Sequence, residues 1–114
     1  MGDRGNIKVG KVYLYTHWGG SEIKDVLKKA LKRKQRWNDE AYLTRIIFCE
    51  MVKDDVESET GFGISTSLCD NEYNILEVDC EKQEVREVTD EGKLVKKWSF
   101  TKFIGEKENE IHLG

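Results

Sequence analysis

The fold class is decided by residues 6–16, which read NIKVGKVYLYT. Two alternating apolar segments flank Gly10-Lys11, and a glycine at the first position of a two-residue loop suits the type II′ turn of a β-hairpin. Pairing Val9 with Val12 gathers the apolar side chains of both strands on one face of the hairpin. The opposite face then carries Lys8, Tyr13, Tyr15 and His17.

Two helices are expected after this hairpin. Ser21 is a suitable N-cap, and apolar residues follow it at helical spacing. These residues are Ile23, Val26, Leu27, Ala30 and Leu31. Asn38 is the expected cap of a second helix, which runs to about Val52. Its apolar positions surround most of the helix, so this helix is either deeply buried or covered by a partner.

The rest of the chain reads as strands. Residues 61–68 alternate between larger side chains and Gly63, Ser65 and Ser67, which leaves one strand face nearly bare. Further strands are expected at about 75–80, 85–89 and 94–100, most simply joined as a β-meander with Gly92 in a left-handed turn position. We expect one core formed by Ile7, Val9, Val12, Leu14, Val26, Leu27, Leu31, Ile46, Ile47, Ile64 and Val78.

The predicted order is β-β-α-α-β-β-β-β. This order predicts an α+β, two-layer domain, a mostly antiparallel sheet with two helices on one face. The chain of 114 residues has the size of one domain. We expect that domain at residues 1–104, followed by a charged tail at 105–114 that frays.

Composition narrows the class of protein. The charged fraction is 36 %, and no apolar run approaches the roughly 20 residues needed to span a membrane. The first ten residues have no secretory hydrophobic segment, which predicts a cytoplasmic protein without a membrane role. The three cysteines, Cys49, Cys69 and Cys80, have no C-x-x-C spacing, so we expect them reduced and mostly buried.

Five strings resemble those of a family of small proteins of unassigned function found in prokaryotes and their viruses. They are residues 2–4 (GDR), 13–20 (YLYTHWGG), 42–48 (YLTRIIF), 59–65 (ETGFGIS) and 70–73 (DNEY). The resemblance covers most of the chain up to about Asp79. It implies an accessory role, in a virus or another mobile element, and it carries over no catalytic residue.

The leading candidate site is the junction from strand to helix at residues 16–21 (THWGGS). Free N–H groups and the positive end of a helix dipole favour an anion there. The alternative is an ordinary glycine turn, with Trp18 filling the core. Arg4 and Arg45 are the basic side chains expected to join such a site, and the alternative favoured for Arg45 is an internal pair with a carboxylate such as Glu59. The candidate ligand-binding residues are His17, Trp18, Gly19, Gly20, Ser21, Arg4 and Arg45.

Other groupings carry weaker predictions. Residues 24–36 hold seven basic residues and one acidic residue, and a solvated helix face explains them better than nucleic-acid binding. The acids Asp3, Glu59, Asp70, Glu72 and Asp79 suit turn and surface roles. His17 with Ser65 or Ser67 lacks the G-x-S-x-G signature of a nucleophile, and two histidines make a zinc site improbable.

These observations leave three functions open. The first is a binding or accessory module without catalysis, which recognises a macromolecule or a small anion and needs no cofactor or metal. The second is a small hydrolase or nuclease that uses His17 and nearby carboxylates. The third is a self-assembling homodimer, because the second helix is apolar on nearly all sides.

Overall fold

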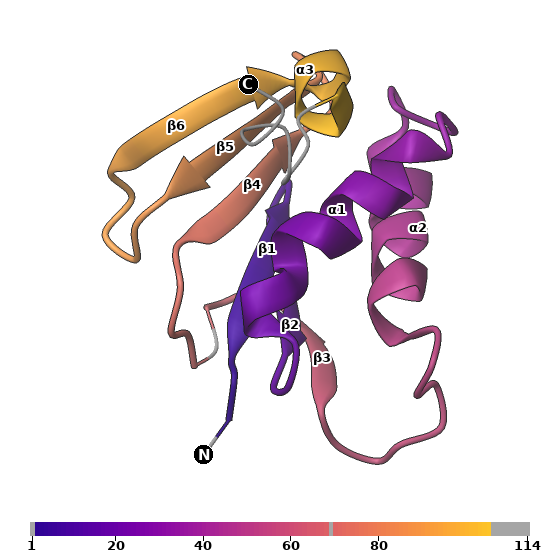
Figure 1. Ribbon diagram of the computed structural model, residues 1–114, viewed down its shortest axis with the longest axis vertical. Helices are drawn as coiled ribbons and strands as arrows, with labels where there is room; N and C mark the ends of the chain where they lie inside the picture. Colours follow the sequence, from indigo (N-terminus) through magenta and orange to yellow (C-terminus); the bar gives the residue numbers. More distant parts are fainter. Residues whose placement is uncertain (1, 69, 106–114) are drawn as a thin grey trace, which may run out of the picture.

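The computed structural model describes residues 2–68 and 70–105. Within them, one six-stranded sheet has the strand order β3-β2-β1-β4-β5-β6 (Figure 1). The strands are β1 (Gly5–Val9), β2 (Val12–Thr16), β3 (Phe62–Ser65), β4 (Ile75–Asp79), β5 (Glu84–Val88) and β6 (Leu94–Ser99). The helical segments are η1 (Gly20–Glu22), α1 (Ile23–Lys32), α2 (Glu40–Val52) and α3 (Phe100–Gly105). The expected α+β class is confirmed.

The hairpin of β1 and β2 has the predicted register. Val9 lies opposite Val12, and Ile7 lies opposite Leu14. Gly10 has a φ of 61°, as the first central residue of a type II′ turn requires. Because the side chains of Ile7 and Leu14 are fully buried, this face of the hairpin is the core face.

The strand order differs from the simplest expectation at β3. Strands β4, β5 and β6 form the expected antiparallel meander, but β3 pairs with β2 at the edge of the sheet. Strand β4 instead lies parallel to β1. The chain between β3 and β4 therefore crosses the sheet on the face without helices, where Arg4 binds Asp70 and Glu72 and Asn6 binds Asp70 and Asn71.

The helices lie on the other face of the sheet (Figure 1). Helix α3 is an addition to the two predicted, because the strand expected at 94–100 ends at Ser99 and Phe100 begins a helix. The hydroxyl of Ser99 accepts a hydrogen bond from the backbone N–H of Lys102 at 3.1 Å, which is the role of an N-cap. Phe100 and Phe103 are thereby buried against the core.

The predicted N-caps of both helices are wrong by one residue. Ser21 does not cap α1, because the chain first makes the 3₁₀ turn η1 and α1 begins at Ile23. Asp39, rather than Asn38, caps α2, since its carboxylate accepts from the backbone N–H of Tyr42 at 3.2 Å. The helices themselves were predicted correctly from their spacing.

Most of the predicted core is confirmed, with one error. Ile64 faces the helical side of the sheet opposite Leu14, yet its side chain is 61 % exposed. Strand β3 is an edge strand, and α2 packs mainly on α1, so no helix covers Ile64. Val12 and Val26 are partly buried and pack against the core.

Helix α2 is covered on one side only. Leu43, Ile46 and Ile47 are buried, whereas Phe48 and Met51 are partly buried against the same core. Arg45 and Tyr42 are exposed. The apolar residues predicted around most of this helix therefore include a partly exposed side, which carries Phe48 and Met51.

The basic residues of α1 are not a uniformly solvated face. Lys28 is buried and its ammonium lies 5.8 Å from the ring centre of Phe103. Lys24 pairs with Glu87 at 3.5 Å and lies 5.4 Å from the ring centre of Trp98. The long alkyl stems of these lysines thus cover apolar surface between α1, β6 and α3.

Three remaining expectations concern the chain as a whole. In residues 2–68 and 70–105, no helix has both the length and the apolar character needed to cross a bilayer. Cys80 is buried and Cys49 partly buried, and both are free thiols, while Cys69 lies outside the described residues. The predicted tail also lies outside them, apart from Gly105 at the end of α3.

Candidate functional site

The junction between β2 and α1 is built around a glycine in close contact with the N-terminal segment. The backbone N–H of Gly20 donates to the carbonyl oxygen of Asp3 at 2.7 Å. A Cβ atom at Gly20 would lie 2.7 Å from the carbonyl carbon of Arg4. Only glycine permits this approach of two backbones. Gly20 of the glycine pair found in the sequence therefore has a packing role.

The anion predicted at this junction is supplied by the chain itself. The carboxylate of Asp3 accepts from the backbone N–H of Ser21 at 3.1 Å and from its hydroxyl at 2.7 Å. The hydroxyl of Tyr73 donates to the same carboxylate at 2.5 Å. The bonds from Tyr73 and Ser21 hold the pKa of Asp3 below its usual range. An internal carboxylate thus occupies the position expected for a ligand.

His17 is held by neighbours of the same face. Its Nδ1 atom lies 2.8 Å from the hydroxyl oxygen of Tyr15, and its backbone N–H donates to the carbonyl oxygen of Gly61 at 2.8 Å. Within the described chain, no carboxylate or serine hydroxyl forms a hydrogen bond with its ring. The hydroxyls of Ser65 and Ser67 lie near each other instead, at 3.3 Å.

The two arginines expected at this site lie apart. The guanidinium of Arg4 binds Glu72 at 2.8 Å and Asp70 at 3.2 Å, and the hydrogen bond to Glu72 raises the pKa of Arg4. Arg45 is exposed on α2, and its guanidinium lies 3.8 Å from the sulfur of Cys49. It has no carboxylate partner in the described residues, Glu59 included. The junction therefore brings Arg4 toward His17, but not Arg45.

Two cavities lie beside the junction, and their linings differ. One cavity, of about 310 Å³, lies between the start of α1 and β4, and includes Ser21 and Tyr73. Its polar groups are satisfied internally, since Glu87 binds both Lys24 at 3.5 Å and Asn74 at 3.0 Å. No charged group at this hollow is left to attract an anion.

The other cavity, of about 240 Å³, lies under Trp18. It is lined by Thr16, Trp18, Gly19, Glu22, Ile23, Val26, Met51 and Phe62. The indole of Trp18 does not fill the core, as the glycine-turn alternative supposed, but is 56 % exposed. Ile64, on the same strand face as Phe62, extends the apolar area to the edge of the sheet. We name Trp18, Val26, Met51, Phe62 and Ile64 the Trp18 surface.

Trp18 has a fixed position on this surface. A Cβ atom at Gly61, whose φ is 105°, would lie 2.7 Å from the indole nitrogen of Trp18. The ring of His17 contacts the indole edge-on, with 4.3 Å between the ring centres. Gly61 and His17 thus confine the indole from two sides while leaving more than half of its surface open.

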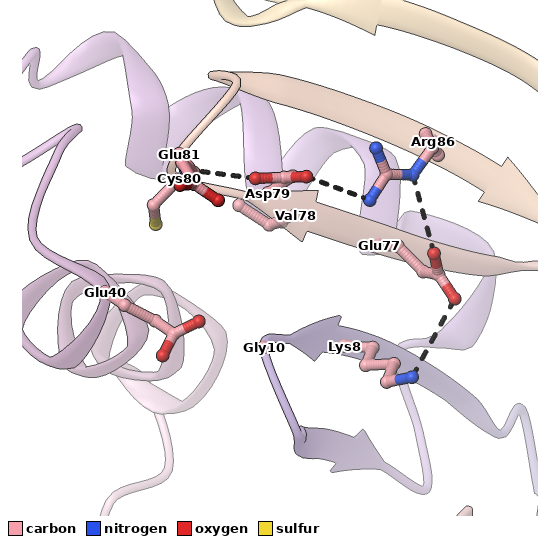
Figure 2. A pocket seen from close by; sticks show the side chains of 9 residues that line it. All are labelled: Lys8, Gly10, Glu40, Glu77, Val78, Asp79, Cys80, Glu81 and Arg86. Atoms are coloured by element: carbon pink, nitrogen blue, oxygen red, sulfur yellow. Dashed lines mark hydrogen bonds and ion pairs between the residues drawn. The ribbon is translucent and has the colours of Figure 1, made fainter.

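A separate hollow of about 280 Å³ lies at the far end of β1 and β4 (Figure 2). Arg86 at its rim binds Asp79 at 3.2 Å and Glu77 at 3.6 Å, and Lys8 lies 4.0 Å from Glu77. The carboxylate of Asp79 also accepts from the backbone N–H groups of the following turn. This network holds β4, β5 and their turn together, so we assign it a structural role.

Burial makes the thiol of this hollow unreactive. Cys80 is buried, and desolvation raises its pKa to about 11, so little thiolate forms at neutral pH. Across residues 2–68 and 70–105, no three side chains of the metal-binding types are grouped as a metal site would need.

Sequence reasoning found Trp18 but missed most of its surroundings. Asp3 and Tyr73 lie far from the junction in sequence, and nothing in their spacing links them to Ser21. Phe62 did give a signal, because it alternates with the bare positions of its strand. Met51 gave no signal of its own, because it is one of many apolar residues around the second helix.

Comparison with known proteins gives no further guide. No protein-family model matches the chain, and neither the curated proteins nor the solved structures include a match. The function must therefore be inferred from the geometry described above.

Proposed function

We propose that this protein is a binding module that recognises another protein through the Trp18 surface. The observation that carries the proposal is the indole of Trp18, which is 56 % exposed over a cavity of about 240 Å³ lined by both apolar and polar residues. Tryptophan is the residue type most enriched among the strongest contributors to protein interfaces. An exposed indole next to a hollow with apolar walls at Val26, Met51 and Phe62 therefore favours protein recognition.

The fixed position of Trp18 supports this function. A side chain that is mobile before binding loses rotamer entropy in the complex, which weakens the association. Trp18 already contacts Gly61 and His17, and these contacts restrict the orientations of its indole before a partner binds. The cavity beside it has room for one apolar side chain of a partner, which would be surrounded by Val26, Met51 and Phe62.

The other candidate functions have less support. For an anion site, the internal carboxylate of Asp3 already satisfies Ser21. For a hydrolase, the described residues bring no carboxylate to the ring of His17. The resemblance noted in the sequence favours an accessory protein of a virus or mobile element, and we retain that role and a cytoplasmic location as parts of the proposal. Neither affects the experiment.

Site-specific photo-cross-linking tests the proposal in cells that carry the gene. A photoreactive amino acid replaces Trp18 in one variant and Tyr42 in the control, because Tyr42 is a 48 % exposed aromatic residue on α2 outside the Trp18 surface. We expect a discrete polypeptide adduct from position 18 and none from position 42. The proposal fails if position 18 gives no polypeptide adduct, or if both positions give the same adducts.

A further inference from the structure

Acidic residues from two parts of the chain adjoin the residues of the Trp18 surface in sequence. Glu22 lines the cavity itself, and Asp25 directly precedes Val26 on α1. The loop 53–60 begins two residues after Met51 and ends next to Gly61, which contacts Trp18. All eight residues of this loop are exposed. Its acids are Asp54, Asp55, Glu57 and Glu59.

These six carboxylates lack cationic partners. Within residues 2–68 and 70–105, none of them forms an ion pair, and Lys53, the one cation of the loop, pairs with Glu50 at 2.8 Å. Several acids elsewhere in the fold are paired, although Glu40, Glu81, Asp90 and Glu91 form no ion pair within the described residues either. Glu72 is paired with Arg4, Glu87 with Lys24, and Asp79 with Arg86. Most of the carboxylates without an ion pair in the described residues therefore belong to segments that adjoin the Trp18 surface in sequence.

We propose that the partner of the Trp18 surface is a basic protein segment, with Lys or Arg side chains on both sides of one apolar anchor. The inference rests on the proposed function and adds the chemistry of the partner to it. The anchor enters the cavity beside Trp18, and the cations lie against the acidic rim formed by Glu22, Asp25 and the loop 53–60. Such complementary charges speed association and select against acidic partners.

A second copy of this chain fits the surface less well. In a symmetric dimer, the Trp18 surface of one copy would pack against the Trp18 surface of the other. The acidic rims of the two copies would then face each other. Like charges brought together across an interface weaken it. The exposed edge of β3 offers strand pairing between copies, but the charge around it opposes that contact.

Selection of random peptides displayed on phage tests the partner chemistry. Peptides are selected on the full-length protein, and those that also bind the Trp18→Ala variant are removed. We expect the remaining peptides to carry more Lys and Arg than the starting library, around a large apolar residue. Their affinity should fall about thirtyfold in Trp18→Ala, the loss typical of an interface hot spot. The Tyr42→Ala control should bind like the wild type.

Reversing the charge of two rim residues measures the contribution of the acidic rim to binding separately from that of the apolar anchor. We expect the Glu57→Lys/Glu59→Lys variant to bind the selected peptides about five- to tenfold more weakly, as two partly exposed ion pairs imply. The Glu81→Lys/Glu91→Lys control changes the net charge equally, at exposed residues away from the rim, and should leave the affinity nearly unchanged. At about 1 M salt, where the Debye length is about 3 Å, the two reversed variants should converge.

The outcomes distinguish the two proposals. If Trp18-dependent peptides are neutral or acidic, the basic partner is wrong and protein recognition at Trp18 stands. If no Trp18-dependent peptide is recovered, the proposed function itself is contradicted. Sedimentation of the wild type and Trp18→Ala tests whether the partner is a second copy of this chain. Self-association that requires Trp18 would contradict the basic partner. Thermal melting of Trp18→Ala and Trp18→Phe confirms that both variants fold.

Discussion

The carboxylate of Asp3 accepts two hydrogen bonds from Ser21, one from its backbone N–H and one from its hydroxyl. An acid from the N-terminal segment thereby occupies the start of the helical layer, where the exposed N–H groups would otherwise bind a foreign anion. The feature that most resembled a ligand site in the sequence is, in the fold, an internal contact between two distant segments.

Replacing Asp3 should convert the internal contact into a vacant anion position. The Asp3→Ala variant leaves Ser21 and Tyr73 without their acceptor, so we expect a lower melting temperature than that of the wild type. Phosphate or sulfate should raise the melting temperature of the variant and have little effect on the wild type. Equal responses in both proteins would show that the anion binds elsewhere, and the experiment requires only thermal melting with and without the salt.

Asp79 should make stability depend on acid pH. Hydrogen bonding from the backbone N–H of Lys82, together with Arg86, lowers the pKa of Asp79 below its ordinary 3.8. A lowered pKa means that its stabilisation is fully present above pH 3.8 and is lost as the pH falls through the lower value of the folded state. We expect Asp79→Asn to be less stable than the wild type at pH 6 and to approach it near pH 2. A constant difference across urea titrations at these two pH values would contradict this assignment.

Leu27 and Ile64 provide a matched test of the packing. Leu27 is fully buried, whereas Ile64 is 61 % exposed. Truncating a buried leucine removes contacts and leaves a cavity, so Leu27→Ala should lower the free energy of unfolding by about 2 to 5 kcal/mol. Ile64→Ala should change it by about 0.5 kcal/mol or less, as at an ordinary surface position. Comparable losses in urea unfolding would mean that β3 is covered.

Gly10 and Gly92 test backbone conformation at two turns. Their φ values are 61° and 88°, and a side chain in such a conformation costs about 1 to 3 kcal/mol. A Cβ atom at Gly10 would also lie 2.2 Å from the carboxylate of Glu40, whereas Gly92 has open space around it. The Glu40 side chain is exposed and can move away. We therefore expect similar losses from Gly10→Ala and Gly92→Ala.

Adding Glu40→Ala to Gly10→Ala separates the two causes. Because backbone strain remains when the carboxylate is removed, the double variant should stay nearly as unstable as Gly10→Ala in thermal or urea unfolding. Full recovery of stability in the double variant would instead assign the loss to crowding by Glu40.

Local features of the fold were predictable because they depend on residues close together in sequence. The register of Val9 with Val12 follows from alternation and from one glycine turn, and α1 follows from the spacing of Ile23, Leu27 and Leu31. Each predicted cap lies one residue before the observed one, Glu22 for α1 and Asp39 for α2. Ser21 shows one reason, since its N–H and hydroxyl bind Asp3 from a distant segment, whereas the cap at Asp39 is made locally with Tyr42.

The sequence by itself determined the hairpin, the amphipathic first helix and the α+β class, because periodicity and turn chemistry act over a few residues. Only the tertiary structure decided that β3 lies at the edge beside β2, that Asp3 binds Ser21, and that Trp18 is exposed rather than buried. The physical reason is that each of these features joins segments far apart in the chain. Their energies depend on how the sheet and helices pack around the chain between β3 and β4, and no local pattern encodes that arrangement.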